Sequence, residues 1–132
     1  MAGTVTQTHV KRGPVGVVIL TCTGDATDGS YPATDLTTKI SGKIIAIETN
    51  PGATAPTDNY DIVLDDTNGH DVLEAAGANR DTANTEKAAV AFGTYFGSPV
   101  SVSDVLTLKV TNNSVNSAIT VVTIYYEGDF EG

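Results

Sequence analysis

The residues of this chain that could do chemistry gather between Asp58 and Leu73, where the sequence reads DNYDIVLDDTNGHDVL. Five aspartates, an Asn-Gly pair and one of the two histidines fall within these sixteen residues. Carboxylates at this density can form a calcium site, an acid–base pair or only a solvated turn. The spacing and the neighbouring elements decide between these alternatives.

An EF-hand calcium loop does not fit the spacing around Gly69. Such a loop needs an oxygen ligand at its first position, Gly at the sixth and Glu at the twelfth. With Gly69 at the sixth position, Leu64 is first and Ala75 is twelfth. An irregular calcium site stays open as the minor alternative to a solvated turn, because Ca²⁺ accepts flexible oxygen shells. Its candidate ligands are Asp65, Asp66, Asn68 and Asp71.

Zinc, nucleophilic and phosphate chemistry find no supporting spacing elsewhere in the chain. A zinc site with several nitrogen or sulfur ligands would need His9, His70 and Cys22 to converge from separate segments. The chain has neither a G-x-S-x-G nucleophile motif nor a glycine-rich phosphate loop. Cys22 lies in an apolar segment, which is typical of a small buried hydrophobic residue. We therefore predict a protein that is not an enzyme and binds no cofactor.

Charge and composition restrict the partners. Sixteen acidic residues oppose seven basic ones, for a formal net charge of -9, which argues against binding to DNA or RNA. The longest apolar run, Val15 to Leu20, is too short to span a bilayer. The N-terminal MAGTVTQTH lacks the pattern of a signal peptide. Synthesis in the cytoplasm, with no membrane or nucleic-acid partner, is the expectation.

Strand-like segments alternate with turn signals along the whole chain, which is typical of an all-β domain. We predict a mainly antiparallel β-sandwich or jelly-roll-like barrel with a single domain. Residues 1–14 are expected to form an extended arm or edge strand, 15–127 the sandwich and 128–132 a short acidic tail. The predicted strands are 15–23, 39–49, 60–65, 105–111 and 118–126, and the last two are expected to pair as a hairpin.

Several local details follow from the same pattern. The reverse-turn sequence Asp66 to Gly69 predicts a hairpin after strand 60–65. Gly42 is a possible bulge, with Ile45 and Ile47 on one face of the strand. Segment 15–23 is expected to be buried on both faces or central in a sheet. Residues 72–78 and 86–92 fit either a strand or a short helical piece.

The second half of the chain resembles a known group of proteins. The run NPGATAPTDNYDIVLDDTNGHDVL, the segment GANRDTANTE, Ser98-Pro99-Val100 and the closing VLTLKVTNNSVNSAITVVTIYY resemble small structural proteins of tailed-bacteriophage virions. The resemblance spans about Ile44 to Tyr126. It implies a virion component, most like a capsid decoration (cement) protein. Its expected partners are the major capsid protein or another virion protein and further copies of itself, with a trimer favoured.

The N-terminal segment is the predicted contact with such partners. It is polar and β-prone, and an extended segment of this kind can add a strand to a neighbouring sheet. It also carries the only adjacent cationic pair of the chain. The predicted partner-binding residues are Thr4, Val5, Thr6, Gln7, Thr8, His9, Val10, Lys11 and Arg12.

Two further classes stay open at this point. A phage tail or head-tail connection protein would share the same composition and fold. A glycan-binding or adhesin-like sandwich would instead need exposed aromatic side chains. The candidates for that role are Tyr31, Tyr95, Phe96 and Tyr126.

Overall fold

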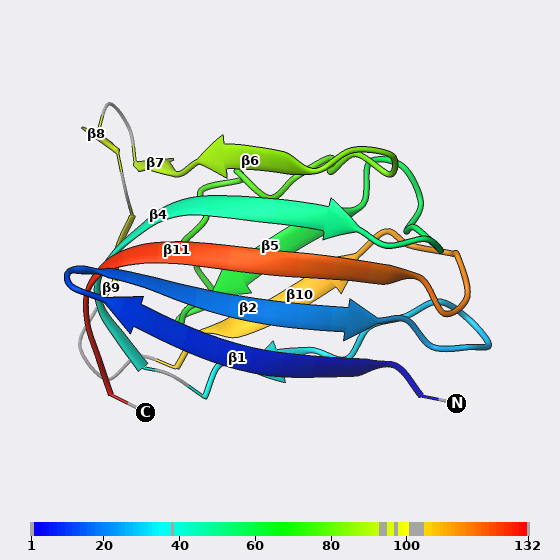
Figure 1. The fold of residues 1–132 in the computed structure, drawn as a ribbon, viewed down its shortest axis with the longest axis horizontal. Helices are drawn as coiled ribbons and strands as arrows, with labels where there is room; N and C mark the ends of the chain where they lie inside the picture. The colour runs from blue at the N-terminus through cyan, green and yellow to red at the C-terminus, as the bar shows by residue number, and fades with distance from the viewer. Residues whose placement is uncertain (1, 38, 93–94, 97, 101–104, 132) are drawn as a thin grey trace.

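The computed structural model describes residues 2–37, 39–92, 95–96, 98–100 and 105–131. Two antiparallel sheets pack against each other within this part of the chain, the larger one lying in front in Figure 1. The predicted single-domain, all-β sandwich is confirmed. Among the described residues there is no helix that is long and apolar enough to cross a membrane.

The larger sheet has the strand order β1-β2-β11-β4-β6, and β9 also pairs with β4. All of its pairings are antiparallel. β1 forms one edge of this sheet, and β6 and β9, which pair with successive parts of β4, lie along the other (Figure 1). Its strands are β1 (Thr4–Arg12), β2 (Val15–Thr23), β4 (Lys39–Pro51), β6 (Glu86–Ala89), β9 (Ser98–Val100) and β11 (Ile119–Glu131).

The smaller sheet has the order β3-β10-β5, and a separate two-stranded ribbon pairs β7 with β8. The core lies between the two sheets, because each strand directs alternate side chains inward. Leu20 and Ile124 from the larger sheet belong to the same buried cluster as Ile62 and Leu108 from the smaller one. The remaining strands are β3 (Thr34–Asp35), β5 (Asp61–Asp65), β10 (Thr107–Thr111), β7 (Ala91–Phe92) and β8 (Tyr95–Phe96).

The predicted hairpin between the last two strands is wrong. β10 pairs with β5 and β3, whereas β11 pairs with β2 and β4 in the other sheet. Both strands bury one apolar face, and they do so from opposite sides of the core. The connection between them therefore crosses from one sheet to the other. The Asn113 side chain holds this crossing, since it accepts from the Thr57 backbone N at 2.8 Å and donates to the Gly29 carbonyl at 2.8 Å.

The predicted strand at 60–65 is confirmed, and so is the set of side chains that it directs into the core. The turn that follows it does not lead into a second strand, so the predicted hairpin is not formed. Tyr60, Ile62 and Leu64 are fully buried or nearly so. The turn closes as expected, with the Gly69 N donating to the Asp66 carbonyl at 3.1 Å and Gly69 at φ 82°. After it the chain makes an isolated bridge to β5 at Asp71 and continues in a series of turns instead of a second strand. Val72 N donates to the Leu64 carbonyl and Ile62 N to the Gly77 carbonyl, each at 2.8 Å, while the regular ladder of β5 is formed with β10.

The bulge in β4 lies at Ile45 and not at Gly42. Tyr125 of β11 pairs with Ala46, and the next residue pairs with Ile44, so one residue of β4 is extra. The bulge breaks the alternation, and therefore Ile44 and Ile47 are fully buried while Ile45 is half-buried. The prediction that Ile45 and Ile47 share a face is consequently wrong.

Two expectations about strand ends and burial also change. β2 is internal in the sheet but buries only one face, with Val18, Leu20 and Cys22 inward. β11 runs to Glu131 and pairs with the start of β4, so the backbone of the predicted acidic tail belongs to the sheet up to that residue.

Candidate interaction surface

β1 is a long and regular edge strand. It pairs with β2 from Thr4 to Arg12 without a bulge, and no other described strand pairs with its free side. An edge of this kind presents backbone N–H and C=O groups to another chain, and proteins usually blunt it with proline, bulges or charges. β1 has no proline, and its only charged residues, Lys11 and Arg12, stand at one end. Residues 4–10 therefore form an edge without these protections.

Inward side chains fix β1 to its own sandwich. Gln7 donates from Nε2 to the Asp35 carbonyl at 2.8 Å and accepts on Oε1 from the Thr37 backbone N at 3.0 Å. His9 Nε2 lies 2.5 Å from the Tyr126 hydroxyl, and the two rings stack with centroids 5.8 Å apart. The N-terminal segment is thus an edge strand of this chain and does not extend away from it.

The nine predicted partner-binding residues divide into two sets. Val5, Gln7, His9 and Lys11 are half-buried against their own chain. Burial, followed by the Lys11 charge, lowers the pKa of His9 from 6.5. The exposed set is Thr4, Thr6, Thr8, Val10 and Arg12.

Four of these exposed residues, Thr4, Thr6, Thr8 and Val10, continue across the sheet into a surface that we call the outer face. The register aligns them with the odd-numbered residues of β2 from Val17 to Thr23 and of β11 from Ile119 to Tyr125, and Val15 adjoins these rows on β2. Among the described side chains, the three exposed large hydrophobic ones, Val10, Val15 and Ile119, all lie here. The outer face consists of Thr4, Thr6, Thr8, Val10, Val15, Val17, Ile19, Thr21, Thr23, Ile119, Val121, Thr123 and Tyr125.

The outer face itself carries no charged side chain, and the charged residues nearest to it lie at its margin. At one end of the outer face, Arg12 of β1 and Glu127 of β11 both pair with Val15 of β2, so that the three residues form one row across the sheet. On the neighbouring strand β4, Glu48 accepts a hydrogen bond from the Tyr125 hydroxyl at 2.8 Å, and this bond raises the pKa of Tyr125. Lys87 places its ammonium 4.0 Å from the centroid of the same ring. An uncharged field of this extent on a chain with a net charge of -9 is a surface suited to protein contact.

The predicted calcium candidates are occupied by bonds within the chain. Asp66 accepts two backbone N–H groups at 2.9 and 3.0 Å, which lower the pKa of its carboxyl. Asp71 accepts three, at 3.0 to 3.1 Å, and Asp65 pairs with Lys109 at 2.8 Å. Within the described part of the chain, no three His, Cys, Asp or Glu side chains are grouped to hold a metal ion. These carboxylates instead order the turns after β5.

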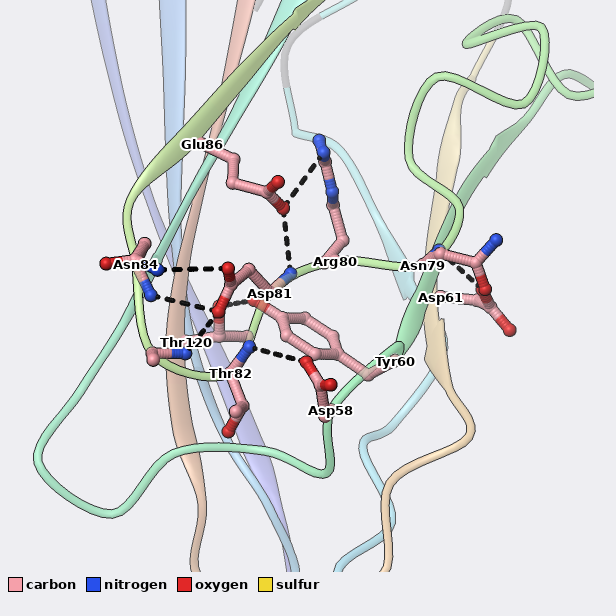
Figure 2. A network of polar contacts seen from close by, with 11 residues as sticks. Asp58, Tyr60, Asp61, Asn79, Arg80, Asp81, Thr82, Asn84, Glu86 and Thr120 are labelled. Atoms are coloured by element: carbon pink, nitrogen blue, oxygen red, sulfur yellow. Dashed lines mark hydrogen bonds and ion pairs between the residues drawn. The ribbon is translucent and has the colours of Figure 1, made fainter.

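A buried arginine near the opposite edge of the larger sheet was missed by sequence reasoning. Arg80 is 7% exposed and donates from Nη2 to Glu86 Oε1 at 3.1 Å, an oxygen that also accepts the Asp81 backbone N at 2.8 Å (Figure 2). Its Nε and Nη1 have no hydrogen-bond partner among the described residues. Its backbone pairs with Tyr60, whose hydroxyl lies 2.7 Å from Thr120 Oγ1. This network joins the beginnings of β5 and β6 to β11.

No local signal in the sequence marks that network. Arg80 and Glu86 are six positions apart, which would leave them about 20 Å from each other in a continuous strand and matches no contact spacing of a helix. The one hint is that no other Lys or Arg lies between Lys43 and Lys87.

The aromatic residues do not gather into an open platform in the described structure. Tyr31 is 9% exposed and donates its hydroxyl to the Ala118 carbonyl at 3.0 Å. It lines a hollow of about 210 Å³ together with residues 29–30 and 110–113. Tyr126 is fully buried. Tyr95 and Phe96 are described only as the backbone of β8, so their side chains lie outside this comparison.

Cys22 has the buried role that its sequence predicts. It is fully buried in the core, and its burial raises the pKa of the thiol to about 12. A thiol in this state is a poor nucleophile and a poor metal ligand.

The fold and the surface together define a class of protein: an all-β sandwich that presents a regular edge strand and an uncharged sheet face. No protein-family model matches this chain, and no curated protein or solved structure matches it either.

Proposed function

We propose that this chain is a non-enzymatic structural protein of a tailed-bacteriophage virion, which binds the outer surface of the capsid and stabilises it as a symmetric oligomer. The motif resemblance over about Ile44 to Tyr126 suggests the virion. The major capsid protein is the proposed partner. The features of β1 suggest how the chain would dock.

The observation that carries this proposal is the unprotected edge of β1. Over residues 4–10 the strand is regular and contains neither proline nor Lys, Arg, Asp or Glu. No described strand pairs with its free side. A strand or extended loop of a capsid subunit could continue the larger sheet at this edge, with backbone hydrogen bonds supplying the affinity. Gln7 and His9 hold β1 in place, so little backbone ordering is needed when the partner binds.

A rigid sandwich with such an edge suits a protein that reinforces a particle. Reinforcement requires a fixed distance between two contact points, and both edges of the larger sheet belong to one twisted but continuous layer (Figure 1). The Arg80–Glu86 network fastens the edge opposite β1 in the same way as Gln7 fastens β1 itself. These contacts tie both edges of the larger sheet to the rest of the sandwich, which suits a protein that reinforces a particle.

The test is to analyse virions released by the phage or prophage that encodes this chain. Mass spectrometry of purified particles should find the chain at a fixed ratio to the major capsid protein. Cryo-electron microscopy should place sandwich-sized density on the outer capsid, with β1 nearest the shell. Particles that lack the chain altogether would overturn the proposal. Density confined to the tail or to the head-tail junction would replace the capsid role by a tail or connection role.

A further inference from the structure

We infer that two copies of this chain pair by stacking their outer faces about a two-fold axis parallel to β2. The proposal concerns the purified chain, so it goes beyond binding to a virion. A second copy is the partner because the face and its charged rim are complementary to themselves.

The outer face is a region where a second copy of this acidic chain can come into contact without electrostatic repulsion. Each copy carries a net charge of -9, so close contact through acidic loops would be repulsive. Across three neighbouring strands the outer face has no charged side chain, and it contains the three exposed large hydrophobic residues. Stacking would remove these side chains from water without bringing carboxylates together.

The register of the sheet makes this face self-complementary. β1 and β11 flank β2, so a two-fold axis along β2 places β1 of each copy over β11 of the other. Each β1 residue then meets the β11 residue of its own row, which sets Thr8 opposite the partner's Thr123 and Val10 opposite the partner's Tyr125. The residues of β2 meet their own counterparts.

The charged row at the end of the face fixes the orientation. Arg12, Val15 and Glu127 follow one another across β1, β2 and β11. Under the same two-fold axis, Arg12 lies opposite the partner's Glu127, and the symmetry repeats this pair. Other rotations about the sheet normal lose both pairs. The arrangement is also an aligned sheet-on-sheet packing, in which the sheets lie about 10 Å apart and long side chains can meet at the rim.

Sedimentation velocity over a series of protein concentrations tests the pairing. We expect wild type to form a dimer. Arg12→Glu and Glu127→Arg should each weaken dimerisation by about tenfold or more, because each places like charges opposite each other twice. The double variant Arg12→Glu/Glu127→Arg should regain most of the wild-type affinity, since it exchanges the charges and preserves the net charge. Ile19→Glu should give a monomer, because it places a carboxylate in the middle of the stack.

Lys109→Glu is the matched control, since it changes the net charge as Arg12→Glu does but lies on β10 in the other sheet. It should leave dimerisation within about twofold of wild type. Circular dichroism checks that every variant is folded. A wild-type monomer or trimer, a dimer that persists in Ile19→Glu, or a charge exchange that restores nothing would overturn the pairing. None of these results bears on whether the chain is found in virions, so the two proposals fail separately.

Discussion

Replacing Gly16 by alanine should disturb the position of β1, because Tyr126 occupies the space that a side chain would need. Gly16 of β2 pairs directly with Tyr126 of β11. A Cβ atom on Gly16 would lie 2.0 Å from Cζ and 2.3 Å from the hydroxyl oxygen of the tyrosine. The Tyr126 ring is fully buried, and His9 stacks on it. The ring therefore cannot move aside without releasing its contact with β1.

The size of the effect follows from two losses. Overpacking a buried site by one methyl group costs about 1 to 3 kcal/mol. Displacing Tyr126 also removes its hydrogen bond with His9, which contributes about 1 kcal/mol. We expect Gly16→Ala to lower the free energy of unfolding by about 2 to 4 kcal/mol in total. For a domain of this size, that corresponds to a melting temperature lower by roughly 10 °C.

Urea unfolding followed by circular dichroism measures this loss, and a double-mutant cycle identifies its cause. Tyr126→Leu is destabilising by itself, but it removes the ring atoms that a Cβ at Gly16 would meet. Gly16→Ala should therefore cost much less in the Tyr126→Leu background than in wild type. Equal costs in the two backgrounds, or a cost below about 0.5 kcal/mol in wild type, would refute the steric explanation.

Three other substitutions test the described contacts. Glu86→Ala leaves the buried Arg80 guanidinium without its ion partner and should cost about 3 kcal/mol in urea unfolding, whereas Arg80→Met/Glu86→Ala should be closer to wild type. Asp71→Ala removes the acceptor of three backbone N–H groups and should cost about 2 kcal/mol, equally in Ca²⁺ and in EDTA; a larger loss in Ca²⁺ would make Asp71 a ligand. Folding lowers the pKa of His9 from 6.5, so the unfolded chain takes up this proton first as the pH falls. Melting temperature should therefore fall from pH 7 to about pH 5, and His9→Gln should flatten this part of the curve.

The sequence predicts those parts of the fold that depend on neighbours along the chain. Alternation marks the buried side chains of Tyr60, Ile62 and Leu64, because a strand with one face in the core repeats every two residues. The Asp66 to Gly69 turn is readable for the same reason, since Gly69 adopts a positive φ that glycine accepts readily. Features of this kind are set within a few residues of where they appear.

Strand partners depend on distant residues and could not be predicted in the same way. The segments 107–111 and 119–131 are close in sequence and both alternate, which is also what a hairpin would show. Their separation into different sheets is defined by their partners, β5 and β3 for the first and β2 and β4 for the second, which lie far away in the sequence. The bulge at Ile45 is similar, because it is defined only by the register between β4 and β11.

The candidate surface shows the same division. β-Propensity and polarity identify Thr4 to Arg12 as an edge or arm, and the structure makes this segment an edge strand. The outer face, however, exists only because β11 from the far end of the chain lies beside β2. Its uncharged character is not visible along the sequence, where Val121 and Thr123 alternate with core residues.

The edge of β1 and the outer face are geometrically independent, and this separates two steps of assembly. Stacking about an axis along β2 covers the outward side chains of β1, while the free backbone edge of the strand points sideways in the plane of its sheet. Each pair therefore keeps two open edges, and a particle that engages both gains avidity. Phage carrying Arg12→Glu should still incorporate the chain, but at lower occupancy when the chain is limiting, and the exchange with Glu127→Arg should restore it. If Arg12→Glu abolished incorporation and the exchange did not restore it, the side chains of β1 rather than its edge would be the contact with the capsid.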